Sequence, residues 1–321
     1  DDLIVLSADW SEDLYDKIHK ITLEHKELGS YLLAEAKLKS ISTDKTTAKF
    51  VLRLIDKDIP FEIALGTEDG HEVIGLDNSV YEVEGLKAKA LSLKEFFQQY
   101  PPTMFLLNGC TIAGCIHTDY GEEHLQTIPE ENLVPIDWGT TDFKVESHYK
   151  STTQRQNSIQ EFMMQRLVNE GADVVFNDDN SGESADIVAV FLKDELVQFK
   201  LIHCKYSKEK AGARKSDLYE VCGQAIISLR YKWKTEELLK HMERRNKTGV
   251  LAGKRFYHGG STDLNAIKQA LKYSNVEFEF AVAQPGVAVS QLDEDMNRFL
   301  NSIYSTVIEM TETKLMCYFS E

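Results

Sequence analysis

Residues 181–207, SGESADIVAVFLKDELVQFKLIHCKYS, hold three side chains whose types and spacing could do chemistry together. His203 and Lys205 are two positions apart, so in a strand their side chains project from one face. Asp186 opens the preceding strand, and a hairpin would bring it beside His203. The Asp186 carboxylate and the Cys204 backbone carbonyl are oxygen ligands of the kind that Mg²⁺ prefers. Lys205 would orient an attacking water or neutralise a phosphate, so the pattern predicts hydrolysis by metal-activated water.

The alternative is that these residues lie together without a chemical role. Lys205 follows the apolar run Phe199–Cys204, and a lysine on a buried strand is costly unless a carboxylate or a phosphate pairs with it. This favours a built site. A cysteine nucleophile is disfavoured, because Cys204 is adjacent to His203 in a strand and therefore points to the opposite face.

The elements that must position these residues alternate between helix and strand. Strands over 185–191 and 196–206 form the hairpin, a helix over 158–170 precedes it, and a long helix over 216–245 follows it. The remaining predicted elements are strands over 173–176, 276–283 and 315–319 and helices over 263–272 and 292–310. Together they predict an α/β domain over 145–321, with a mixed central sheet flanked by helices.

This order of elements resembles the core of the PD-(D/E)xK nuclease superfamily, which is restriction-endonuclease-like. The family's core is a helix, an Asp-bearing strand, a strand ending in (Asp/Glu)-x-Lys, and a second helix; here Asp186 and His203-Cys204-Lys205 occupy the two motifs. The resemblance implies a metal-dependent nuclease. His203 stands where the family has a carboxylate, and a neutral imidazole should weaken Mg²⁺ and favour Mn²⁺. Glu183 could restore a carboxylate if its loop folds inward.

The resemblance also implies two flanking residues of the site. The family's first helix often presents an acidic or amide side chain to the metal, and Gln160 falls at that place, with Glu161 beside it. The RecB-like branch uses a Gln-x-x-x-Tyr helix near its site. Gln224 is the matching glutamine, although Tyr231 follows it further along than in that pattern.

The wider sequence is similar to a nuclease domain at the C-terminus of large bacterial DEAD/DEAH-helicase proteins. The similar runs are PPTMFLLNGCTIAGC (101–115), IHCKYSKEKAGARKSDLYEVCGQA (202–225) and FAVAQPGVAVSQL (280–292), and the resemblance covers most of residues 60–321. Such proteins act in restriction-like antiphage defence. The resemblance therefore implies a helicase as an upstream domain or a separate partner, and DNA as the expected nucleic acid. GVLAGK at 249–254 is too short for a nucleotide-binding P-loop.

Charge is distributed unevenly along the chain. Residues 1–150 hold 14 Lys/Arg and 28 Asp/Glu, whereas residues 201–255 hold 14 basic and 6 acidic side chains, within a chain of formal net charge −16. The local basic zone is compatible with a phosphate backbone, and with a solvated helix face as the alternative. Four basic residues directly follow the active-site strand and are the predicted nucleic-acid contacts: Lys208, Lys210, Arg214 and Lys215.

The first half predicts a separate acidic, β-rich module over residues 1–140, with 119–142 as a connection between domains. A short helix over 91–97 should be halted by Pro101-Pro102. The expected strands are at 34–41, 49–56, 61–65, 72–74 and 80–83, with Gly- and Asn-containing turns between them.

Composition excludes several classes of protein. The chain of 321 residues is 42% hydrophobic and 27% charged, which is typical of a soluble globular protein. No apolar run approaches the roughly 20 residues of a bilayer span, and no signal peptide is evident, so a cytoplasmic location without membrane contact is expected. Five cysteines suit buried thiols; a zinc site at Cys110, Cys115 and His117 is a weaker alternative, because no clear fourth ligand follows.

Two other functions compete with catalysis. The nuclease fold could carry too weak a metal site and only bind nucleic acid, or the acidic first half could dock a helicase. A homo-oligomer is compatible with every version.

Overall fold

The computed structural model describes residues 5–14, 17–33, 36–43, 46–54, 57–67, 70–106, 110–114, 116–118, 126–179 and 183–321. The chain divides into two compact units, Asp1–His124 and Leu125–Glu321. We expected the first module to extend to residue 140, and this boundary is wrong. Residues 126–136 belong to the second unit: Ser305 and Asn301 hold the backbone N–H groups of Gln126 and Ile128, and a strand at Leu133–Ile136 joins its sheet. The Pro-containing acidic composition of this segment hid the strand.

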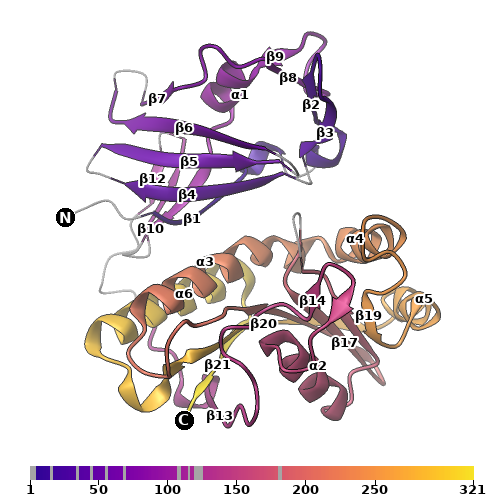
Figure 1. Cartoon of the computed structure of the whole chain (residues 1–321). Coiled ribbons are helices and arrows are strands. Elements are labelled where there is room, and N and C mark those ends of the chain that lie inside the picture. Colours follow the sequence, from indigo (N-terminus) through magenta and orange to yellow (C-terminus); the bar gives the residue numbers. More distant parts are fainter. Residues whose placement is uncertain are drawn as a thin grey trace. The chain divides into compact units, whose positions relative to one another are not determined.

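The first unit is rich in strands, as predicted, and its described strands pair antiparallel (Figure 1). Its described strands form the sheets β1-β10-β11-β12, β3-β2-β8-β9 and β4-β5-β6-β7. Their bounds are β1 Val5–Asp9, β2 Thr22–His25, β3 Gly29–Leu32, β4 Lys37–Thr43, β5 Thr47–Arg53, β6 Asp58–Leu65, β7 His71–Ile74, β8 Tyr81–Glu84, β9 Leu91–Ser92, β10 Thr103–Leu106, β11 Thr111–Ala113 and β12 Ile116–Thr118. Short 3-10 helices lie at Glu12–Leu14 and Ile18–Lys20.

Helix α1 (Leu93–Gln99) supplies aromatic side chains to the core of this unit. A capping box between Ser92 and Glu95 starts the helix, and the chain leaves it at Tyr100, before the two prolines. The Phe97 ring stacks on Phe61 at a centroid distance of 4.4 Å. The predicted helix is therefore confirmed, and its role is packing.

The second unit is a mixed α/β fold around a seven-stranded sheet in the order β13-β21-β20-β18-β17-β16-β19. The bounds of its strands are β13 Leu133–Ile136, β14 Tyr149–Lys150, β15 Thr153–Gln154, β16 Val174–Asn177, β17 Ile187–Lys193, β18 Leu196–Cys204, β19 Phe256–His258, β20 Asn275–Ala288 and β21 Lys314–Ser320. Strands β13, β21, β20 and β18 run parallel, whereas β17, β16 and β19 continue the sheet in antiparallel pairs. The predicted mixed central sheet is confirmed.

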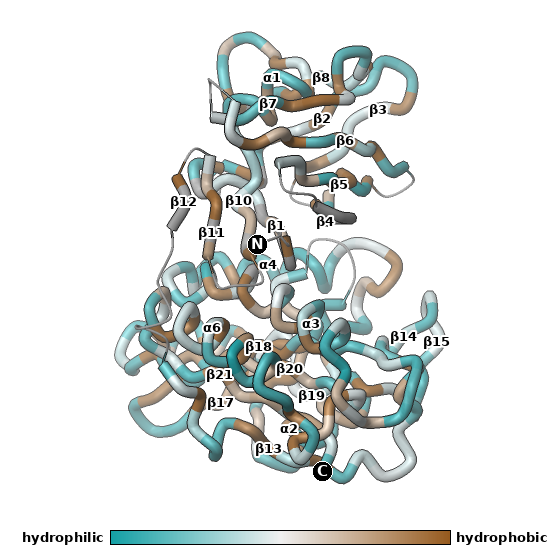
Figure 2. Tube along the Cα trace, turned by 90° about the vertical axis from the view of Figure 1, so that its left-hand side faces the viewer, coloured by the Kyte–Doolittle hydropathy of each residue, from teal (hydrophilic) through white to brown (hydrophobic). Residues whose placement is uncertain are grey.

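Helices cover both faces of this sheet. Helix α2 lies on one face, and α3 and α6 lie on the other (Figure 1). Because both faces are covered, Ile187–Phe191 of β17 is buried at every position, which explains its continuous apolar sequence. Hydrophilic residues predominate in the surrounding loops (Figure 2). The bounds of the helices are α2 Ile159–Asn169, α3 Lys215–Ser228, α4 Thr235–Lys247, α5 Ser261–Ala270 and α6 Glu294–Thr311, with 3-10 helices at Glu130–Asn132, Leu229–Trp233 and Val289–Gln291.

The prediction of one long helix over 216–245 is wrong, because the segment folds as separate elements. It is α3, a 3-10 turn at Leu229–Trp233, and α4, and the backbone of Lys234 leaves the helical region between them. The second helix has its own charge signature, with Glu236 and Glu237 in its first turn and basic residues in its last, which complements a helix dipole. The break lets α4 turn toward the loop before β17.

The described residues test two further predictions, one on the cysteines and one on membrane spans. The four described cysteines, Cys110, Cys204, Cys222 and Cys317, are buried thiols, and Cys115 of the alternative zinc site lies outside the described residues. Among the helices that the structure describes, none is both long enough and apolar enough to cross a bilayer.

Candidate active site

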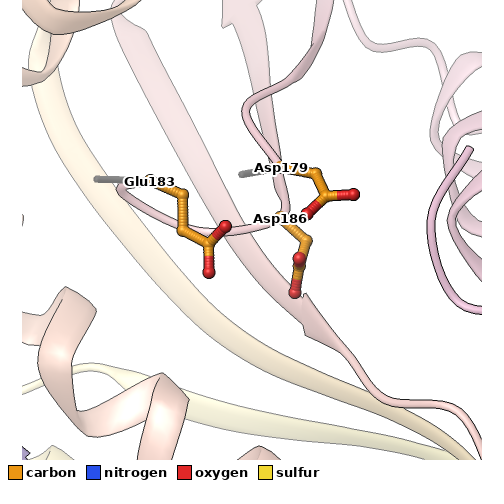
Figure 3. Close-up of side chains that lie close together, drawn as sticks. All are labelled: Asp179, Glu183 and Asp186. Atoms are coloured by element: carbon orange, nitrogen blue, oxygen red, sulfur yellow. The ribbon is translucent and has the colours of Figure 1, made fainter. Parts of the chain in front are cut away.

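Three carboxylates meet in the loop between β16 and β17. One ligand oxygen from each of Asp179, Glu183 and Asp186 lies within 4.8 Å of the others, and Figure 3 shows the three side chains lying close together. Asp186 is buried, and the other two are half-buried. Carboxylates this close repel one another unless a cation or protons neutralise them. Three oxygen donors on one loop fit a hard divalent cation such as Mg²⁺ or Mn²⁺.

Asp186 is held by two hydrogen bonds that fix its carboxylate. The backbone N–H of Cys204 donates to Oδ2 at 2.8 Å, and Nε2 of Gln160 donates to Oδ1 at 3.2 Å. The Gln160 amide is itself oriented, because its Oε1 accepts from the backbone N–H of His148 and from Nδ2 of Asn177. Gln160 of α2 therefore lies beside Asp186, as the resemblance implied, and it acts there as a hydrogen-bond donor.

His203 stands on the other side of Asp186. Its Nδ1 lies 3.6 Å from Asp186 Oδ2, and its Nε2 lies 2.6 Å from Ser228 Oγ. The Ser228 hydroxyl donates its proton to the Ser184 carbonyl at 2.5 Å, so its oxygen accepts from His203 Nε2–H. This hydrogen bond turns Nδ1 toward the carboxylates, and a neutral imidazole in this tautomer can ligate a metal.

Cys204 contributes its backbone, and its side chain is buried. The thiol belongs to the hydrophobic core beneath α2. Burial, together with the charges of Asp186, Glu146 and Asp179, raises the pKa of the Cys204 thiol and so disfavours the thiolate that a nucleophile requires. The ligand role predicted for its carbonyl stays a prediction.

Lys205 is paired with two carboxylates. Its Nζ lies 2.7 Å from Glu220 Oε1 on α3 and 3.7 Å from Glu146 Oε2. Burial lowers the pKa of Lys205, but the charges of Glu146 and Glu220 raise it more, so the ammonium stays charged. We expected Lys205 to face the metal site directly. The ion pairs that the structure describes for its ammonium are instead with Glu146 and Glu220.

Glu146 is a residue of the site that the sequence did not reveal. Its Oε2 accepts the backbone N–H of Tyr206 at 2.9 Å. Burial raises the pKa of Glu146, Lys205 lowers it, and the charges of Asp179 and Glu220 add to the increase, so the net shift is upward. Glu146 thus connects Lys205 electrostatically with the loop carboxylates. It follows a long acidic segment, where one more Glu gives no distinct signal.

Gln224 lies on the face of α3 that runs along the end of β18. Glu220 and Ser228, four residues before and after it, contact Lys205 and His203, and residues at this spacing share one helix face. The Oε1 of Gln224 is buried and accepts no hydrogen bond from any residue that the structure describes. Gln224 therefore shares a helix face with the residues that contact Lys205 and His203, and its role in the site stays a prediction.

The four predicted nucleic-acid contacts fall into two pairs. Lys208 and Lys210 line a surface cavity of about 340 Å³ together with Lys144, which the sequence did not single out. Arg214 and Lys215 are already ion-paired: Arg214 with Glu209 at 2.5 Å, and Lys215 with Asp293 and Asp295 at 3.1 and 2.6 Å. The first pair is better placed to meet a phosphate.

Comparisons of this chain with protein-family models, with curated proteins and with solved structures each found no match. Function must therefore be argued from the site itself.

Proposed function

We propose that residues 125–321 form a divalent-metal-dependent nuclease with a restriction-endonuclease-like core of the PD-(D/E)xK type. The observation that carries this proposal is the cluster of Asp179, Glu183 and Asp186, with one oxygen of each within 4.8 Å of the others and Nδ1 of His203 3.6 Å from Asp186. Asp186, Glu183, Asp179 and His203 would hold the cation. A bound Mg²⁺ or Mn²⁺ would lower the pKa of a water and neutralise charge on a phosphodiester.

The chain's own groups have separate tasks in this proposal. Gln160 and the Cys204 N–H keep the Asp186 carboxylate oriented toward its neighbours. The charged ammonium of Lys205 would neutralise a phosphate oxygen in exchange for its Glu220 partner, whose side chain is 55% exposed. Gln224 offers an amide beside Lys205 and His203 to orient a water or a phosphate. The negative charge of Glu146, which raises the pKa of Lys205, would help to keep the ammonium charged.

The biological setting rests on the sequence resemblance. We propose DNA as the substrate, a DEAD/DEAH-type helicase as the upstream domain or partner, and action in the cytoplasm in antiphage defence. The second candidate function is a module of the same fold that binds nucleic acid without cleaving it, which the Lys144, Lys208 and Lys210 cavity would serve equally well.

His203 should set the metal preference. We expect Mn²⁺ to support faster cleavage than Mg²⁺, because imidazole is a softer ligand than a carboxylate. Replacing His203 with Glu should lower the ratio of Mn²⁺-supported to Mg²⁺-supported rates by about tenfold or more, with the Ser228 hydroxyl reorienting to donate to the new carboxylate. Initial rates in both metals measure the ratio. Loss of activity in both metals alike would instead make His203 a base and leave the metal to the carboxylates.

Lys208 and Lys210 should carry more of the nucleic-acid affinity than Arg214 and Lys215. Removing one phosphate-binding side chain reduces the slope of log affinity against log salt by about 0.9. In the Lys208→Ala/Lys210→Ala variant, the slope for duplex DNA in EDTA should therefore fall in magnitude by about 1.8. The Arg214→Ala/Lys215→Ala variant should change it much less, because its residues already hold intramolecular partners. An unchanged slope in the first variant would remove these lysines from the interface.

A further inference from the structure

Asp178 is a fully buried carboxylate next to the proposed metal loop. Its Oδ2 lies 2.7 Å from Nε2 of His241, and its Oδ1 accepts from Nε of Arg245 at 2.9 Å. Both partners come from α4, the helix that the sequence merged with α3. Burial raises the pKa of Asp178, but His241, Arg245 and the Ser184 backbone together lower it by more. The pKa of Asp178 therefore lies well below its usual range. The carboxylate is therefore ionised and paired inside the fold.

The Asp178 carboxylate also connects the two described segments of the loop, residues 178–179 and 183–186, which we call its limbs. The backbone N–H and the hydroxyl of Ser184 both donate to Asp178 Oδ2, at 2.6 and 2.8 Å. Asp178 precedes Asp179, and Ser184 follows Glu183, so this contact fixes the chain beside two of the three carboxylates. The Asp178 N–H also donates to the carbonyl of Asp186, beside the third.

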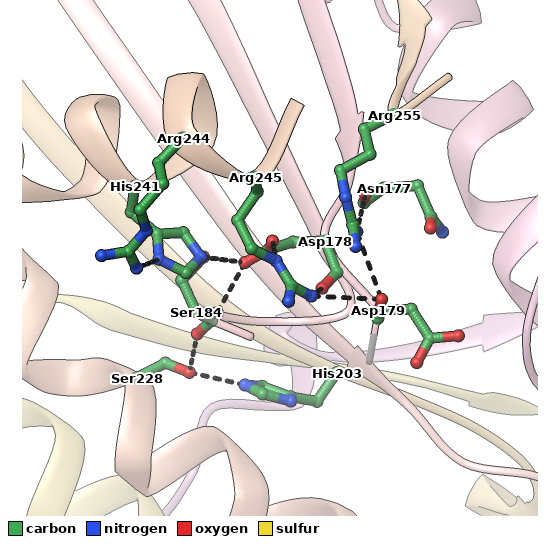
Figure 4. A network of polar contacts seen from close by, with 10 residues as sticks. All are labelled: Asn177, Asp178, Asp179, Ser184, His203, Ser228, His241, Arg244, Arg245 and Arg255. Carbon is green, nitrogen blue, oxygen red and sulfur yellow. Dashed lines mark hydrogen bonds and ion pairs between the residues drawn. The ribbon is translucent and has the colours of Figure 1, made fainter. Parts of the chain in front are cut away.

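Two arginines secure the backbone on the Asp179 limb. A guanidinium nitrogen of Arg245 donates to the carbonyls of Asp178 and Asp179, at 2.6 and 3.3 Å. Arg255 donates to the carbonyls of Asn177 and Asp179, at 3.1 and 3.2 Å. Figure 4 shows both side chains reaching this stretch of chain from one side.

The network continues to His203. The Ser184 carbonyl accepts from Ser228, and Ser228 accepts from Nε2 of His203 (Figure 4). A continuous path of hydrogen bonds thus runs from α4 through Asp178, Ser184 and Ser228 to the imidazole. Each of the five side chains along it, from His241 to His203, is at most 5% exposed. Water therefore cannot readily substitute for a missing partner.

We propose that Asp178 is a positioning residue, through which α4 holds the Asp179, Glu183 and Asp186 carboxylates and the His203 tautomer ready for a metal ion. The inference rests on the proposed function, because it assigns a purpose to the same site. We call the contacts of Asp178 with α4 and with Ser184 the clamp. Carboxylates within 4.8 Å of one another repel, so without the clamp the three carboxylates would move apart. Asp178 itself would not touch the metal. It acts through the backbone on both sides of the loop.

Mn²⁺ titration of the whole chain tests the clamp, with calorimetry as the readout and thermal unfolding followed in parallel. Asp178→Asn keeps the size of the side chain and removes its charge. We expect the Kd for Mn²⁺ to rise by about 10- to 100-fold in protein that is folded at the temperature of titration. Ser228→Ala cuts the path at its His203 end without touching a charge, and it should raise the Kd by about tenfold. Ser302→Ala, a buried serine of α6 outside the path, is the matched control and should leave the Kd unchanged.

Hydrogen exchange of the metal-free protein separates the two proposals. The clamp predicts faster exchange at residues 178–179 and 183–187 in Asp178→Asn, with β20 unaffected. Unchanged exchange at those residues together with an unchanged Kd overturns the clamp alone. A wild-type chain that binds no Mn²⁺ overturns the proposed metal site, and the clamp's purpose with it. A Kd that rises equally in Ser302→Ala would show a general effect of core substitution and would also overturn the clamp.

Discussion

Replacing Asp186 with Asn is expected to reduce metal-dependent cleavage at least about a thousandfold, because several kcal/mol of transition-state stabilisation would depend on the metal that this carboxylate holds. The substitution preserves the size of the side chain, and the amide oxygen can still accept from the Cys204 N–H. The fold should therefore persist. Cleavage rate, Mn²⁺ binding and thermal unfolding are measured on the same preparation.

Asp173→Asn is the matched control for this change. Asp173 lies in the same unit, and its carboxylate accepts the backbone N–H of Leu192 away from the acidic loop. Cleavage should survive in this control. A folded Asp186→Asn protein that cleaves as fast as the parent would remove Asp186 from the site.

Neutralising Lys205 should slow cleavage strongly and leave metal binding intact. Lys205→Met keeps most of the apolar stem, removes the ammonium, and should slow cleavage by about 100- to 1,000-fold, the usual cost of removing one charge-stabilising group. Because Lys205 is not a metal ligand, the Kd for Mn²⁺ should change far less than in Asp186→Asn. Loss of metal binding that matches the loss of rate would make Lys205 a structural residue.

Lys200→Met provides a close control for Lys205→Met. Lys200 lies on β18, the strand that ends one residue before Lys205; it has a similarly buried side chain and pairs with Glu170 and Glu279 at 3.3 Å each. It lies outside the proposed site, so its substitution should leave the cleavage rate intact.

The Lys205 variant also has a defined pH signature through Glu146. The pKa of Glu146 is already above its ordinary 4.5, and the loss of Lys205, which lowers it, should raise it further. A carboxyl group with a raised pKa in the folded state costs stability as the pH rises through that pKa. The difference in unfolding free energy between parent and variant should therefore be small near pH 4.5 and grow as the pH rises above it. Urea unfolding at a series of pH values gives this difference.

Local sequence patterns predicted the elements around the site, because runs of apolar residues indicate which segments are buried. The apolar runs of β17 and β18, with a charged turn at residues 193–195 between them, indicated a hairpin, and β17 and β18 pair as one, with Ile187 opposite Ile202. The place of Asp186 beside His203 follows directly from that register. Gln160 and Gln224 came from the family resemblance; Gln160 donates a hydrogen bond to Asp186, and Gln224 lies on the same helix face as Ser228, which contacts His203.

The parts that could not be predicted depend on contacts between distant segments. Asp179 sits in the cluster NDDNSG, which reads as a turn, and only the folded loop turns its carboxylate toward Asp186. Glu146 meets Lys205 across 59 positions of sequence, and no spacing rule relates them. The pairing of Asp178 with α4 was hidden for a further reason, because α4 was merged with α3 into one helix. A charge-pattern reading of Glu236, Glu237 and the basic last turn would have separated the two helices.

Cleavage of plasmid DNA by the intact chain, in Mg²⁺, in Mn²⁺ and in EDTA, with Asp186→Asn and Lys205→Met beside the parent, tests the central claim most directly. The proposed site predicts cleavage by the parent in Mn²⁺ and more slowly in Mg²⁺, none in EDTA, and cleavage by either folded variant that is slower by about 100-fold or more. Cleavage that persists in EDTA, or that both variants carry out at the parent's rate, would contradict the claim. Binding of DNA without cleavage in either metal would also contradict it, and would favour the nucleic-acid-binding module in its place.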